Sequence, residues 1–236
     1  MPTIPRRPRK RVVFLDLDDT VVDTFERIIK IQEAHVAELI AARLQSDRPL
    51  CPAEIAAEAL RLRRRDPASL ERWTISLLPA AGEELVELRR AGLARVPLGG
   101  LRLTAGQRRM LAKLARSHRL ILLTEGLPDL QLRKIRRLRL APYFERIEIV
   151  DPMEGGDKEQ VLRRWVSGDR DSQMPVVVGN RLDREIAAGA RLGLPTIWIR
   201  KGEGGLRPLR PLDPRPTLTI RDIGQLPGAL RRLPRR

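Results

Sequence analysis

The second half of the chain alternates short apolar runs with longer stretches that have an amphipathic helical pattern. Strands are predicted at the apolar runs 119–123, 146–150, 175–178 and 196–200. Helices are predicted between them at 104–117, 127–138, 157–166 and 183–192. Strands that alternate with helices in this way predict an α/β fold, with a Rossmann-like parallel sheet and crossover helices on both of its faces.

The first part of the chain has one such strand and then a long helical segment. The apolar run Val12–Leu15 predicts a buried strand. The stretch 24–95 that follows shows little strand pattern, and helices are predicted there at 24–45, 53–65, 67–78 and 82–90. Because this helical segment interrupts an otherwise α/β chain, we interpret residues 24–98 as an inserted helical cap.

The two ends of the chain complete the predicted domain organisation. The α/β core comprises residues 11–23 and 99–236, and the Pro/Arg-rich residues 1–10 are expected to form a disordered basic arm. Residues 202–216 are rich in Gly, Pro and Arg and predict a loop. An edge strand is predicted after that loop, at 217–220, and a last helix follows it.

Composition changes this picture mainly through charge. The 46 Lys and Arg residues outnumber the 30 Asp and Glu residues, which gives a net charge of +16. Such a charge favours anionic partners, which include phosphorylated metabolites, nucleic acids and acidic proteins. The Arg residues are spread over many segments and only 3% of residues are aromatic, which disfavours a base-stacking platform. We therefore prefer a solvated Arg-rich surface over nucleic-acid binding, which stays open for the basic arm.

Cysteine content and hydropathy indicate the compartment. The single cysteine, Cys51, excludes an internal disulfide. No run of 18 apolar residues is present, and the charged N-terminus is not followed by the apolar core of a signal peptide. We therefore expect a cytoplasmic protein with no membrane association. The sequence leaves its oligomeric state open.

Candidate chemistry begins where the first predicted strand ends. Asp16, Asp18 and Asp19 follow that strand, and Thr20 comes next. Neighbouring carboxylates repel one another, and a hard divalent cation, which prefers oxygen ligands, would relieve the repulsion. The alternative interpretation is a solvated acidic turn.

Polar groups also follow the other predicted strands. Thr124, Glu125 and Gly126 come directly after one strand, residues 180–185 follow another, and Lys158 begins a helix after a third. Because ligands of open α/β sheets bind at the carboxyl ends of the strands, these groups are expected to converge in one crevice. A carboxylate nucleophile, a second acid, a hydroxyl and a cation are the groups that phosphoryl transfer through an aspartyl intermediate needs.

Four motifs in this order resemble those of the haloacid-dehalogenase-like (HAD) hydrolase superfamily. They are FLDLDDTVVDT, LILLTEG, the lysine of GGDKEQVL, and VVVGNRLDREIAAGARLGLPTIWI. The segment LPDLQLRKIRRLRLAPYFERI also resembles the part of the superfamily that follows the second motif. The resemblance covers most of residues 11–200, and it implies a capped, phosphatase-type hydrolase.

The resemblance implies a role for each matching residue. Asp16 would be the nucleophile that forms an aspartyl-phosphate, and Asp18 would protonate the leaving oxygen and later activate water. Thr124, with backbone N–H groups near Glu125 and Gly126, would hold the phosphoryl oxygens. Lys158 would neutralise the nucleophile and the phosphate.

The resemblance also implies a Mg²⁺ cofactor at the fourth motif. The implied metal-site residues are Asp16, Asp18 through its backbone carbonyl, Asn180, Asp183 and Glu185. The superfamily usually has an acid directly after the glycine of this motif, where this chain has Asn180. An amide oxygen can bind Mg²⁺ but brings no charge, so Asp183 and Glu185 would have to supply it.

Three functions are compatible with these motifs. The preferred one is a magnesium-dependent phosphatase of a small phosphorylated metabolite. A dehalogenase of the same fold is the second, because metal-independent dehalogenases also have Asn at position 180, but they lack an acid at the position of Asp18. The third is a catalytically weak HAD-fold module that binds an acidic partner or nucleic acid.

Overall fold

The structure is a computed structural model, and it describes residues 10–44, 51–65, 67–77, 82–168, 173–206 and 209–234. The basic arm predicted at 1–10 therefore lies, except for Lys10, outside the described residues.

A six-stranded sheet with parallel pairing throughout forms the centre of the molecule, which confirms the predicted α/β class. Its strands are β1 (Val12–Leu15), β2 (Arg119–Glu125), β3 (Arg146–Val150), β4 (Val176–Gly179), β5 (Thr196–Ile199) and β6 (Leu218–Ile220). The strand order is β3-β2-β1-β4-β5-β6. Strand β1 lies in the middle, where Val13 pairs with Leu120 of β2 and with Val176 of β4.

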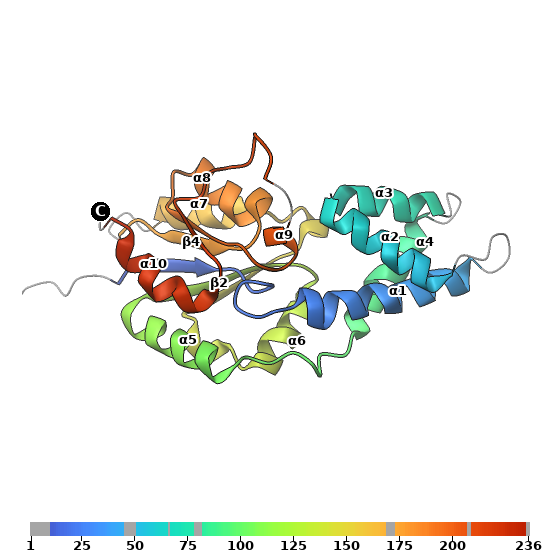
Figure 1. The fold of residues 1–236 in the computed structure, drawn as a ribbon, viewed down its shortest axis with the longest axis horizontal. Helices are drawn as coiled ribbons and strands as arrows, with labels where there is room; N and C mark the ends of the chain where they lie inside the picture. Colours follow the sequence, from blue (N-terminus) through green and yellow to red (C-terminus); the bar gives the residue numbers. More distant parts are fainter. Residues whose placement is uncertain are drawn as a thin grey trace, which may run out of the picture.

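Helices cover both faces of the sheet (Figure 1). One face carries α5 (Ala105–Ser117), α6 (Pro128–Leu138) and α10 (Leu226–Arg232), and the other carries α7 (Lys158–Gly168) and α8 (Ala187–Arg191). Side chains of a strand alternate between faces. Accordingly, Val13 and Leu15 belong to the apolar cluster of the first face, and Val12 and Phe14 to that of the second. Because both faces are covered, β1 is apolar along its whole length.

Four α-helices form a separate group beside the sheet (Figure 1). They are α1 (Lys30–Arg43), preceded by the π-helical turn η1 (Phe25–Ile29), α2 (Pro52–Arg65), α3 (Pro67–Leu77) and α4 (Gly82–Arg95). An apolar cluster of their own includes Val36, Ile40 and Ile55. The helices follow the predicted pattern, except that α4 extends to Arg95, whereas the prediction ended it at residue 90.

The C-terminal segment contains one helix that was predicted as loop, α9 (Gly202–Leu206). Its glycines allow close packing against the core, since a Cβ on Gly204 would lie 2.5 Å from the carbonyl oxygen of Asn180 and one on Gly205 would lie 2.5 Å from the backbone of Arg200. The same glycines disfavour a helix by intrinsic propensity, so the composition alone predicted the wrong structure. No helix among the described residues has the length and apolar content needed to cross a membrane.

Candidate active site

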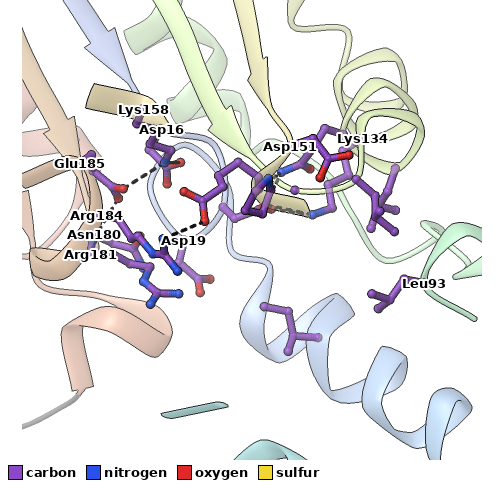
Figure 2. Close-up of a pocket in the computed structure, with 18 of the residues that line it drawn as sticks. Asp16, Asp19, Leu93, Lys134, Asp151, Lys158, Asn180, Arg181, Arg184 and Glu185 are labelled. Atoms are coloured by element: carbon purple, nitrogen blue, oxygen red, sulfur yellow. Dashed lines mark hydrogen bonds and ion pairs between the residues drawn. The ribbon is translucent and has the colours of Figure 1, made fainter. Parts of the chain in front are cut away.

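A pocket of about 310 Å³ lies where the carboxyl ends of β1, β2 and β4 face the helical group. In Figure 2, Asp16, Lys158 and Glu185 lie close together on one side, and Lys134 and Asp151 lie on the other. Leu93 of α4 approaches from the helical group. The strand ends that the sequence singled out therefore do converge, as expected for an open α/β sheet.

Asp16 is the buried acid at the end of β1. Lys158, at the start of α7, donates to Asp16 Oδ1 over 2.8 Å and to Glu185 Oε2 over 3.0 Å. The hydroxyl of Thr20 donates to Asp16 Oδ2 over 3.1 Å. Burial raises the pKa of Asp16, with further increases from Glu185 and Asp18, and the opposing effect of Lys158 is smaller. This group of acids is therefore short of positive charge.

The Lys158 ammonium is the cation that this cluster already contains. Burial by itself would lower the pKa of Lys158, but the carboxylates of Asp16, Glu185 and Glu125 outweigh burial and raise it. Lys158 therefore stays charged, although its side chain is only 5% exposed. The helix dipole disfavours a cation at a helix N-terminus. The position of the Lys158 ammonium at the start of α7 is therefore explained by the two carboxylates that it contacts.

Asp18 points to a different set of partners, on α6. Lys134 Nζ contacts both carboxylate oxygens of Asp18 at 2.9 Å, and Gln131 Nε2 donates to Oδ2 over 3.0 Å. Burial would raise the pKa of Asp18, but the charge of Lys134 and these hydrogen bonds prevail and lower it. The two acids of the first motif therefore have opposite electrostatic environments, although a single residue separates them.

The second motif lies directly beside Asp18. Gln131 Nε2 also lies 2.8 Å from Thr124 Oγ1 and 2.8 Å from the Glu125 carbonyl oxygen. Thr124 is completely buried, whereas Glu125 and Gly126 line the pocket. The Gly126 N–H donates to the Val150 carbonyl, so this N–H group is already used within the fold. Gly126 has φ 143°, a backbone conformation that glycine tolerates.

The fourth motif brings two of its three predicted residues into the pocket. Asn180 and Glu185 line it, whereas Asp183 does not and instead pairs with Arg181 over 2.8 Å. Both oxygens of Glu185 are engaged, with Lys158 and with the Arg181 backbone N–H. A Cβ at Gly179 would overlap the Glu185 side chain, so the glycine before Asn180 makes room for this acid.

Asp19 belongs to the loop rather than to the acid pair. Its Oδ1 accepts hydrogen bonds of 2.9 Å from the backbone N–H groups of Thr24 and Phe25. Its backbone is left-handed, with φ 56°, and a Cβ on Gly202 would overlap its side chain. Asp19 thus caps the start of η1 and connects the loop after β1 to the helical group.

A divalent cation suits the oxygen donors of this pocket. Asp16 carries a carboxylate, Asn180 an amide oxygen, and both line the same cavity. Hard ions such as Mg²⁺ prefer such ligands, and Asp16 and Glu185 share the ammonium of Lys158. Within the described part of the chain, no group of three His, Cys, Asp or Glu side chains forms a ready-made metal site. The fit therefore depends on Asn180 and backbone oxygens as well as on acids.

Sequence reasoning missed Gln131, Lys134 and Gln32. The first two are buried polar residues on α6, 1% and 5% exposed. They are three residues apart and adjoin Leu130 and Ile135 on the buried face of that helix. A pair of polar residues on an otherwise apolar helix face is a pattern that could have revealed them.

The chain resembles known proteins in both sequence and fold. No model of a protein family matches the chain. The glyceraldehyde 3-phosphate phosphatase of Pyrococcus abyssi is 25% identical over 197 residues, which cover 82% of this chain and 82% of that protein. The human N-acylneuraminate-9-phosphatase is 27% identical over 241 residues, and the match covers 94% of each chain.

Solved structures show the same architecture. YfnB from Bacillus subtilis, assigned to the HAD hydrolases and solved with bound magnesium, matches with a TM-score of 0.65 and 21% identity, over 94% of this chain and 99% of that one. A HAD phosphatase from Thermococcus onnurineus matches with a TM-score of 0.60 and 20% identity, over 94% and 98% of the two chains. These likenesses establish the fold.

Proposed function

We propose that the chain is a hydrolase of the haloacid-dehalogenase-like (HAD) superfamily and that it acts as a magnesium-dependent phosphatase of a small phosphorylated metabolite. The observation that carries this proposal is the buried Asp16–Lys158–Glu185 group, with Asp18 in the same pocket. Curated phosphatases match over most of the chain. The order of the motifs along the sequence supports the same conclusion.

The first half of the proposed reaction uses Asp16 as the nucleophile. One of its carboxylate oxygens attacks phosphorus, the bond between phosphorus and the ester oxygen breaks, and an aspartyl-phosphate forms. Asp18 has to be protonated in this half, although its contact with Lys134 favours the ionised form, and it gives that proton to the departing oxygen, which leaves as an alcohol. Lys158, already 2.8 Å from Asp16, offsets the negative charge that accumulates at the phosphoryl group.

The second half regenerates the enzyme. Asp18 takes a proton from a water molecule, which attacks phosphorus and releases Asp16 and inorganic phosphate. In its contact with Lys134 and Gln131, Asp18 is held in the ionised form that this half requires. The hydroxyl of Thr124 is fully buried and contacts Gln131, so it would act on the phosphoryl oxygens through Gln131, which lines the pocket.

The metal belongs to the same proposal. Asp16, the backbone carbonyl of Asp18 and the side-chain oxygen of Asn180 would hold Mg²⁺. Glu185 would orient Lys158, because both of its oxygens already have partners. When bound, Mg²⁺ supplies positive charge that lowers the repulsion between the dianionic ester and the acids of the pocket.

The helical group is proposed to act as the cap over this chemistry. Ile29, Gln32, Leu70 and Leu93 contribute its side of the pocket, and the Asp19 cap ties its first turn to the catalytic loop. A cytoplasmic location is part of the proposal, since the one cysteine, Cys51, is exposed and has no second cysteine to pair with in this sequence, which suits a reducing compartment.

A phosphate-release assay on a panel of phosphorylated metabolites, with and without Mg²⁺, tests the proposed function. We expect turnover of at least one small ester and its loss when EDTA removes the metal. An absence of turnover with Mg²⁺ would contradict the proposal. Halide release from haloacids without metal would instead support a dehalogenase, and steeply salt-dependent RNA or DNA binding without turnover would support a binding module.

Asn180→Asp is expected to strengthen Mg²⁺ binding. The variant adds a negative charge to the pocket that Asp16 also lines, and both positions are buried, where charge interactions are stronger than in water. The concentration of Mg²⁺ that gives half-maximal activity should fall by about tenfold, which corresponds to about 1.4 kcal/mol. A Mg²⁺ titration of phosphate release measures this. An unchanged midpoint would show that Asn180 does not contact the metal.

A further inference from the structure

The wall of the pocket opposite the strand ends comes from the helical group. It consists of three apolar side chains, Ile29, Leu70 and Leu93, and one amide, Gln32. Ile29 and Gln32 are three residues apart on consecutive turns of η1 and α1, so they lie on the same helix face. The leaving group of a substrate bound at Asp16 would face this wall.

Gln32 is unusual in this wall because it is polar and buried at once. The residue is 4% exposed, and among the described residues its Nε2 has no hydrogen-bond partner. A buried donor without a partner is costly, and native proteins contain few of them. A hydrogen-bond acceptor on a bound ligand would satisfy this donor. The Gln32 amide would then have a function in ligand binding, whereas its Nε2 has no hydrogen-bonding role within the fold of the described residues.

The charged side chains of the pocket restrict the ligand further. Each of its four cations faces a carboxylate: Lys158 faces Asp16 and Glu185, Lys134 faces Asp18, Arg184 faces Glu125, and Arg181 faces Asp183. The described pocket lining has more acids than bases; its acids are Asp16, Asp18, Asp19, Glu125, Asp151 and Glu185. A second anionic group on the substrate would therefore meet paired cations and surplus negative charge.

We propose that Gln32 selects substrates whose leaving group is small, uncharged and bears a hydroxyl or carbonyl oxygen. The Gln32 amide donates to that oxygen, while Ile29, Leu70 and Leu93 contact the carbon skeleton. A volume of about 310 Å³ is at the lower end for ligand pockets, which start near 300 Å³, and it suits a short polyol or sugar phosphate. This inference rests on the proposed phosphatase function.

Three esters of the same chain length test the proposal. Glycerol 3-phosphate has hydroxyl groups on its leaving group, propyl phosphate has none, and 3-phosphoglycerate adds a carboxylate. With the wild-type protein and Mg²⁺, kcat/KM for glycerol 3-phosphate should exceed that for propyl phosphate by about tenfold or more, the value of one hydrogen bond to a buried donor. It should also exceed that for 3-phosphoglycerate, whose carboxylate meets the surplus acids of the pocket. Equal or better turnover of 3-phosphoglycerate would overturn the proposal.

Gln32→Leu then assigns the preference to the amide. The variant keeps the side-chain size, so it should lower kcat/KM for glycerol 3-phosphate by about tenfold and change that for propyl phosphate by less than about twofold. Gln160→Leu makes the same change at an exposed position of α7 and should change neither. Gln32→Met serves as a second variant if Gln32→Leu fails to fold.

The remaining outcomes distinguish a wrong role for Gln32 from a wrong phosphatase function. If Gln32→Leu and Gln32→Met lower the turnover of all three esters equally, Gln32 is a structural residue and the proposal is wrong. If the wild-type protein hydrolyses neither these esters nor p-nitrophenyl phosphate, the phosphatase function itself fails. Turnover of p-nitrophenyl phosphate without discrimination between glycerol 3-phosphate and propyl phosphate overturns only the role of Gln32.

Discussion

Asp16→Asn is expected to lower kcat for phosphate release by about 10⁴-fold, the scale on which loss of a nucleophile acts. The amide is a poor nucleophile, so no aspartyl-phosphate can form. The fold should survive, because Lys158 can still donate to the remaining oxygen and Thr20 can accept from the new NH₂ group. The variant also removes a buried charge whose pKa is already raised by burial, so the unfolding temperature should not fall.

The measurement is phosphate release on the best ester of the metabolite panel, with thermal unfolding as the control for folding. Asp129→Asn makes the same chemical change at an exposed position near the start of α6 and should leave kcat unchanged. If Asp16→Asn turned over substrate at the wild-type rate, Asp16 would not be the nucleophile. The pocket would then serve binding rather than covalent catalysis.

The sequence predicted well which end of the sheet carries the pocket, because the cause is local. A buried parallel strand must be apolar on both faces, so the change from Leu15 to Asp16 marks the strand end. The same reasoning found Thr124 and Asn180 at the ends of β2 and β4. The convergence of these ends then follows from parallel topology alone.

Residues whose role depends on packing between distant segments were not predictable in the same way. Gln32 has the pattern of an ordinary polar position on an amphipathic helix, and it is buried only because that helix lies over the pocket. Helix α9 forms where Gly204 and Gly205 fit against the core, against their low helix propensity. Asp183 illustrates the converse, since its sequence position suits a metal site but its side chain turns to Arg181.

The site has two ion pairs with different surroundings, and this arrangement explains how neighbouring acids can take different roles. Asp16 and Glu185 are two carboxylates that share one ammonium group, so their negative charge is only partly neutralised. Asp18 has Lys134 to itself, together with a hydrogen bond from Gln131. A metal ion would therefore relieve repulsion beside Asp16 rather than beside the Asp18 carboxylate, which transfers protons in the proposed mechanism.

Lys158→Met is the variant expected to damage both stability and activity. It leaves Asp16 and Glu185 buried without the cation that they share, and breaking a buried pair in this way costs about 3–5 kcal/mol. Relief of the unfavourable helix dipole at the start of α7 returns only about 0.3–1 kcal/mol. The net destabilisation is therefore about 3 kcal/mol, measured by urea unfolding in EDTA.

Mg²⁺ should restore part of the lost stability of Lys158→Met, because it supplies positive charge beside Asp16. The kcat of this variant should nevertheless stay about 10²-fold below that of the wild-type protein, as when other charge-stabilising groups are removed. Lys158→Arg, which keeps the charge, should retain most of the stability and less of the activity, since a guanidinium cannot reproduce the geometry of an ammonium. Lys113→Met removes a charge from an exposed position of α5 and should change neither. If Lys158→Met were as stable as Lys113→Met in EDTA, the acids around Asp16 would not depend on Lys158 for their stability. The proposed role of a metal ion, to compensate a lack of positive charge beside Asp16, would then be wrong.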